Sequence, residues 1–186
     1  MMINIKTIKE KIFFNKRSPL KYVYFFINKI ISVFSYKKSF SQGSMDLILE
    51  HIFKNKSDGF YVDVGCQHPI RNNNTYLLYK KGWTGLNIDL DSVNIELFNF
   101  FRRNDNNVKS AVSDRIEDAK LFYYHQKSPI NTLDKKISLK QNAKIEKEIN
   151  IQTNTLTNIL DNNSIKKIDL LTIDVEGFEL KVLKGL

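Results

Sequence analysis

The sequence predicts an α/β fold in which a mostly parallel sheet carries helices on both faces. Residues 59–91 follow the pattern strand, tight turn, helix, turn, strand. Residues 168–186 repeat the step from a strongly apolar strand into a helix. Parallel strands require a crossover connection, which is usually a right-handed helical one. We therefore expect a doubly wound sheet built from β-α-β units.

Length and composition are those of one globular domain. The 186 residues are 42% hydrophobic and 12% aromatic, with only seven glycines and three prolines, so a disordered chain is excluded. The single cysteine, Cys66, excludes an internal disulfide and a cysteine-rich metal cluster. A reducing compartment is compatible with this, and we expect a cytoplasmic protein.

The positive charge belongs to an N-terminal extension and not to the domain. Residues 1–40 contain nine Lys or Arg and one acid, Glu10, and so carry +8 of the net charge of +9. Residues 41–186 contain twenty basic and nineteen acidic residues, which leaves +1. A nearly neutral domain argues against a nucleic-acid partner. We place the domain boundary between residues 40 and 41.

Residues 20–34 predict an amphipathic helix in this extension. The uncharged stretch at 22–28 is too short to span a bilayer, and no small-residue cleavage site marks a secretory signal. Two interpretations stay open: the helix packs on the domain or a partner, or it lies peripherally on the anionic inner face of a membrane. Its apolar face comprises Leu20, Val23, Tyr24, Ile27, Ile30, Ile31 and Phe34.

A second helix and a nucleotide half-site follow. Residues 44–53 predict a short helix over one sheet edge, with Ser44 as its N-cap. A strand at 60–64 then turns at Gly65, and a helix at about 75–81 leads to a strand that ends in Asp89. An acid at this position can accept hydrogen bonds from both hydroxyls of a ribose.

The middle of the chain is less regular. A second crossover helix is expected at 91–103, and a third strand at 108–112 would bring residues 110–113 to the ring of a bound nucleotide. Strands at 119–125 and 148–155 flank a polar insertion, where substrate selectivity usually lies. A short helix begins at residue 156.

The last strand, at 168–175, ends in a second candidate group. Asp174 lies at its tip, and Glu176 and Gly177 open a helix at 178–184. Strand-tip carboxylates such as Asp174 can act as ligand acceptors, general bases, metal ligands or helix N-caps. Because a doubly wound sheet should continue past this helix, we expect the fold to be incomplete at its C-terminal end.

Several motifs together resemble the FkbM family of S-adenosylmethionine-dependent methyltransferases. They are YVDVGCQHP, NNNTYLLYKKGWTGLNIDLD, KSAVSD, PINTLD and LLTIDVEGFELKVLKGL, and with the helix at 39–53 the resemblance covers about residues 39–186 in the family's order. It implies a Rossmann-like methyltransferase sheet. It also implies a cofactor site, with Asp63 and Gly65 at the methionine end, Asp89 at the ribose, and Ser110, Ala111 and Val112 beside the adenine.

The resemblance places Asp174 and Glu176 beside the methyl group, and Asn131 and Thr132 toward the substrate. It implies O-methylation of a sugar or glycan hydroxyl, and the basic extension suits a lipid-linked acceptor. A base should assist such a transfer. Asp174 is the first candidate, before Glu176, His68 and His125, and His125 belongs to the substrate-facing insertion. A divalent metal held by Asp174 and a second acid is an alternative, although no ligand cluster argues for it.

The turn after the first strand departs from the wider methyltransferase pattern. It has one glycine, Gly65, and continues Gln67-His68-Pro69. His68 is then either a pocket residue near the sulfonium or a turn residue that bonds the backbone. Two other functions stay open: a non-catalytic binding module, and an NAD-dependent oxidoreductase. The second is disfavoured because a pyrophosphate needs the G-x-G-x-x-G approach.

Overall fold

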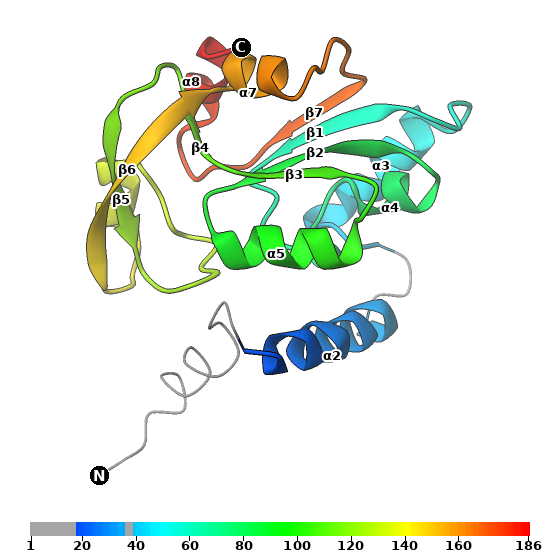
Figure 1. Ribbon diagram of the computed structural model, residues 1–186, viewed down its shortest axis with the longest axis horizontal. Coiled ribbons are helices and arrows are strands. Elements are labelled where there is room, and N and C mark those ends of the chain that lie inside the picture. The colour runs from blue at the N-terminus through cyan, green and yellow to red at the C-terminus, as the bar shows by residue number, and fades with distance from the viewer. Residues whose placement is uncertain (1–17, 36–38) are drawn as a thin grey trace.

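The computed structural model describes residues 18–35 and 39–186 (Figure 1). Its central sheet is four-stranded and parallel, in the order β3-β2-β1-β7. The predicted α/β fold with a mostly parallel sheet is thereby confirmed. The strands are β1 (Phe60–Val64), β2 (Thr84–Asp89), β3 (Asn106–Lys109) and β7 (Leu170–Ile173).

Helices cover both faces of this sheet (Figure 1). On one face, Val62 and Leu86 pack against helices α7 (Leu156–Asn162) and α8 (Glu179–Lys184). Successive strand residues point to opposite faces, so Tyr61 faces the other way and packs with α4 (Tyr76–Lys80). Helix α5 (Ser92–Phe101) is the second crossover helix between β2 and β3.

A second sheet stands beside the first, in the order β4-β6-β5. Its strands are β4 (Ala111–Ser113), β5 (Asp118–Tyr123) and β6 (Lys147–Thr155), and α6 (Lys135–Lys140) lies in the insertion between β5 and β6. The single strand expected at 108–112 was therefore wrong. Lys109 pairs with β2 and Ala111 with β6, because β6 offers a parallel partner where β2 has ended.

The helix before the first strand forms as α3 (Met45–Ile52), after the 3-10 turn η1 (Gln42–Ser44). Ser44 occupies the N-cap position of α3, as predicted, but its backbone is left-handed and its side chain makes no capping hydrogen bond. Asp46 anchors the segment instead. Its buried carboxylate accepts from the Phe40 amide and the Ser39 hydroxyl, each at 2.6 Å.

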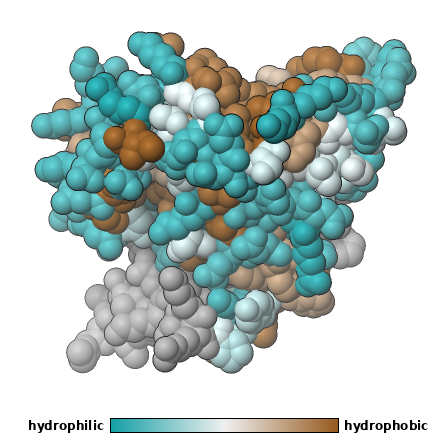
Figure 2. Space-filling view, turned by 45° about the horizontal axis from the view of Figure 1, so that its top comes forward, coloured by the Kyte–Doolittle hydropathy of each residue, from teal (hydrophilic) through white to brown (hydrophobic). Residues whose placement is uncertain are grey.

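The N-terminal helix α2 (Leu20–Ser35) forms where the sequence predicts it. It lies on the side of α5 that faces away from the central sheet (Figure 1). Phe25 is buried against Phe100, with ring centroids 5.8 Å apart. Across residues 18–35 and 39–186, no helix is long and apolar enough to cross a membrane. Figure 2 shows that the hydrophobic surface of its view is broken into separate groups by hydrophilic residues.

Candidate functional site

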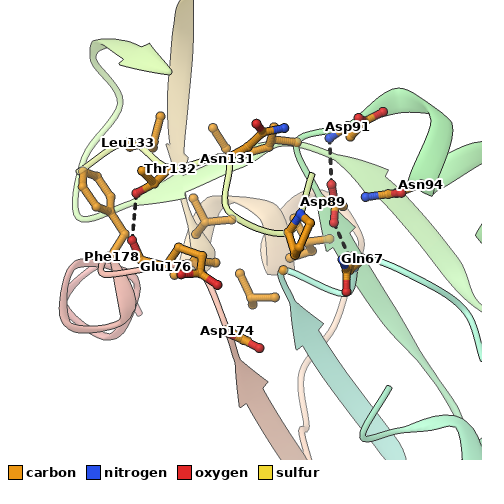
Figure 3. A pocket seen from close by; sticks show the side chains of 18 of the residues that line it. Gln67, Asp89, Asp91, Asn94, Asn131, Thr132, Leu133, Asp174, Glu176 and Phe178 are labelled. Atoms are coloured by element: carbon orange, nitrogen blue, oxygen red, sulfur yellow. Dashed lines mark hydrogen bonds between the residues drawn. The ribbon is translucent and has the colours of Figure 1, made fainter. Parts of the chain in front are cut away.

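The strand order places the candidate site between β1 and β7. From β1 the chain moves outward through β2 and β3 on one side, and β7 then joins on the other side. In open α/β sheets, ligands bind at such a reversal, outside the carboxyl ends of the strands. A cavity of about 90 Å³ lies there, lined by the ends of β1, β2 and β7 and by the insertion (Figure 3).

Gly65 closes one side of this cavity by a very tight turn. Its φ is +81°, and an added β carbon would lie 1.9 Å from the carbonyl oxygen of Asp174. Its amide donates to the Ile88 carbonyl at 2.8 Å. The turn thus brings the ends of β1, β2 and β7 together, and only glycine lets the backbone at position 65 come so close to Asp174.

Asp89 is held as a preorganised acceptor at the end of β2. One carboxylate oxygen accepts from the Gln67 amide at 2.9 Å, and the other accepts from the Asp91 amide at 2.7 Å (Figure 3). Burial raises the pKa of Asp89 to about 6, although these amides oppose the shift. The two backbone amides and a hydrogen bond from the Asn94 side chain occupy three of the roughly four acceptor positions of a carboxylate, so it can still accept from a ligand hydroxyl.

Two further polar atoms at the cavity were missed by the sequence reasoning. The side-chain oxygens of Asn94 and Ser128 are buried and have no hydrogen-bond partner in the described part of the chain. Both residues line the cavity. Leaving a buried polar group unsatisfied costs about 1–3 kcal/mol, so a ligand or water is expected to bind there. The sequence could have indicated Asn94, because it lies in the first turn of α5, directly after the strand that ends in Asp89.

Asp174 and Glu176 form an acidic corner on the β7 side (Figure 3). Burial, and then the charge of Glu179, raises the pKa of Asp174 above its usual range. Burial also raises the pKa of Glu176, with help from both neighbouring acids. No hydrogen bond from the described residues holds the Asp174 carboxylate, and the N-cap of α8 is Phe178. Asp174 is therefore not a helix cap, and its carboxylate is available at the cavity.

The insertion closes over the cavity through Asn131 and Thr132, which both line it. The Thr132 hydroxyl donates to the Glu176 carbonyl at 2.7 Å (Figure 3). The Asn131 amide spans its own loop, accepting from the Tyr124 amide at 2.9 Å and donating to the His125 carbonyl at 3.0 Å. Both side chains fix the shape of the insertion, and a substrate contact by either stays a prediction.

Ser110, Ala111 and Val112 line the cavity at the junction of the two sheets. A second cavity of about 430 Å³ adjoins it and shares Leu90, Asp91, Ser110 and Ala111 with it. The wall of this second cavity includes apolar residues of the β5–β6 pair, such as Tyr123 and Ile149. The two cavities therefore meet at these four shared residues.

Asp63 lies outside the residues that line the cavity. It points to the same sheet face as Tyr61, and it accepts from the Thr75 hydroxyl at 3.0 Å and the Asn73 amide at 3.2 Å. These partners also bind the fully buried Arg102. Asp63 therefore belongs to a buried polar network beneath the turn, and its predicted contact with a cofactor is not supported by this position.

The two histidines proposed for chemistry also lie outside the lining of the cavity. The buried His68 ring accepts from the Ile70 amide at 3.1 Å and the Arg71 amide at 3.0 Å. Burial, and then the charge of Arg71, lowers its pKa to about 2. His68 is thus a neutral turn residue, as the second of its two interpretations states. His125 contacts the Gln126 carbonyl at 2.9 Å.

Fold and site together define an α/β domain with a Rossmann-like parallel sheet, a polar cavity at the carboxyl ends of its strands, and an acid, Asp89, at the end of its second strand. The comparison with protein families makes this specific: the model of the methyltransferase FkbM domain matches residues 63–186, so the chain belongs to that methyltransferase family. The resemblance of the sequence motifs to this family is thereby confirmed. Neither the search of curated proteins nor the search of solved structures found a match.

Proposed function

We propose that this chain is an S-adenosylmethionine-dependent O-methyltransferase whose acceptor is a hydroxyl of a sugar or glycan. The observation that carries the proposal is that Asp89 and the acidic corner of Asp174 and Glu176 line the same cavity. Asp89 is a fixed acceptor for a ribose, whereas Asp174 has an available carboxylate with a raised pKa. Membership of the methyltransferase FkbM family supports the reaction class.

The residues present fit this cofactor. Asp89 would hold the ribose hydroxyls, and the unpartnered oxygens of Asn94 and Ser128 offer further polar contacts. The strand end at Ser110 and Ala111 would face the ring, because it lies where the two cavities meet. Gly65 would lie by the methionine end. When bound, S-adenosylmethionine supplies an electrophilic methyl group on a sulfonium, whose neutral leaving group makes positioning the main requirement.

Asp174 is the proposed general base. A hydroxyl becomes a better nucleophile as its proton leaves, and a positioned base typically contributes about 10²–10⁴-fold. The raised pKa of Asp174 makes its carboxylate a stronger proton acceptor than an aspartate with the ordinary pKa. Glu176 and Glu179 add negative charge beside it, which favours a cationic ligand at this corner. Thr132 holds the insertion against the Glu176 carbonyl, beside this acidic corner.

Calorimetry with S-adenosylmethionine, its demethylated product and NAD tests the cofactor. We expect micromolar binding of the demethylated product, no binding of NAD, and at least about tenfold weaker product binding by Asp89→Ala. Asp118→Ala, at an exposed position on β5, is the matched control. Unchanged affinity in Asp89→Ala would refute the ribose assignment. Binding without turnover on any glycan would favour a non-catalytic module.

A further inference from the structure

The face of α2 that points away from the domain is apolar. Six of its side chains expose between 44% and 57% of their area, and it is their grouping on one helix face that is informative. They follow the spacing of one broad helix face. Lys21 and Lys29 do not interrupt this face, because they point to Glu96 and to the Phe101 ring. The six residues are Leu20, Val23, Phe26, Ile27, Ile30 and Ile31.

The opposite face of α2 holds the helix on the domain. Phe25 is buried against Phe100. Lys21 pairs with Glu96 at 2.9 Å, and the Asn28 side chain accepts from the Arg71 guanidinium at 3.1 Å. The helix is therefore anchored by one large aromatic ring and specific polar contacts. This orientation leaves its most apolar face outward, although burial of that face would have stabilised the docked helix more.

We propose that this outer face of α2 docks on the surface of an anionic lipid bilayer. Apolar and aromatic residues on one helix face, together with basic charge, are what interfacial helices use. The basic charge is present in the sequence, since residues 1–40 carry +8. Charge also argues against a second copy of the chain as the occupant, because two such extensions would repel each other. An anionic surface attracts them instead.

Docking through α2 would bring the candidate active site to the bilayer surface. The ammonium of Lys127 lies 5.5 Å from the Tyr24 ring of α2, and the Lys127 amide donates to Asp91 at 2.7 Å. The neighbouring Ser128 lines the cavity. The helix therefore touches the loop that covers the site. In combination with the proposed function, this placement fits an acceptor sugar carried by a lipid.

Vesicle flotation with the full chain tests the docking. Phosphatidylcholine vesicles that contain phosphatidylglycerol should carry the chain upward, vesicles of phosphatidylcholine alone should carry much less, and added salt should weaken the binding. The double variant Ile27→Ser/Ile31→Ser should lower the partition coefficient at least about tenfold. Leu139→Ser, which removes an even more exposed apolar side chain from α6, is the control and should float like the parent.

Three results would overturn this proposal. The first is a parent chain that does not float with the anionic vesicles, and the second is a double variant that floats as well as the parent. The third is a dimer in sedimentation without lipid that the double variant dissociates, which would assign the face to a second copy. The urea midpoint of each variant shows that the domain stays folded. Flotation does not require methyl transfer, so its failure is distinct from failure of the cofactor calorimetry.

Discussion

Gly65 and Asp174 touch so closely that the first has no room for a side chain. A β carbon on Gly65 would lie 1.9 Å from the Asp174 carbonyl oxygen, and the backbone of Gly65 is left-handed with φ of +81°. Asp174 is the proposed base. The close contact of its backbone with Gly65 therefore links the shape of the turn after β1 to the position of the base. Gly65 is thus a steric requirement of the site.

Gly65→Ala should destabilise the protein by several kcal/mol and abolish binding of the demethylated product. The matched control is Gly43→Ala. Gly43 has a similar φ of +65° but nothing within 4 Å of its added carbon, so only the backbone strain of about 1–2 kcal/mol should appear. Urea unfolding measures both variants. Equal losses would show that the contact with Asp174 is not what excludes a side chain.

Asp174→Asn should reduce turnover by about 10²–10⁴-fold while product affinity changes little, because the amide keeps the shape but cannot take a proton. Single-turnover kinetics separate the two effects. Glu176→Gln is the comparison, and we expect a smaller loss from it. In the parent, the rate should rise with pH through a pKa above the usual aspartate range, since the base must be ionised. A flat pH profile would argue against Asp174 as the base.

Product affinity should also depend on pH through Asp89. Its pKa is about 6 in the free protein, and its carboxylate is the acceptor for the ribose hydroxyls. Affinity should therefore fall as the pH drops below about 6, where the group becomes protonated and loses acceptor capacity. Calorimetry across this range measures the effect. Constant affinity would mean that the carboxylate does not contact the ligand.

Ser128→Ala separates a ligand contact from a packing role. The hydroxyl of Ser128 is buried without a partner in the described chain, so its removal should leave the free protein as stable or up to about 1 kcal/mol more stable. Product binding should weaken roughly tenfold. Ser138→Ala is the control, since that buried hydroxyl donates to the Lys135 carbonyl at 2.8 Å. The control should lose stability and keep its product affinity.

His68 should matter for stability in acid. Its pKa is lowered to about 2 in the folded chain, whereas the unfolded chain binds the proton near pH 6.5. The contribution of the neutral ring is therefore complete above pH 6.5 and is lost as the pH falls below it. In urea unfolding, the free energy of unfolding of His68→Asn should fall less between neutral and acid pH than that of the parent. His51→Asn, at an exposed site, should behave as the parent does.

The sequence by itself determined the order of strands and helices and the acids at the strand tips. Strand and helix periods are local properties, and a turn glycine or a strand-end acid keeps its position along the chain whatever packs around it. For this reason Gly65, Asp89, Asp174 and Glu176, which were chosen from the sequence, all line the cavity, while their roles in binding and catalysis stay predictions.

Only the tertiary structure decided which way the side chains point and which strands pair. Asp63 and His68 are near Gly65 in sequence, but neither lines the cavity. Asp63 accepts a hydrogen bond from Thr75, which is itself held by Arg102 from a distant part of the chain. The His68 ring accepts from the Ile70 amide. The division of residues 106–113 between two sheets depends on β6, which lies far along the chain. The same holds for α2: its periodicity predicts an apolar face, but contacts with α5 turn that face outward.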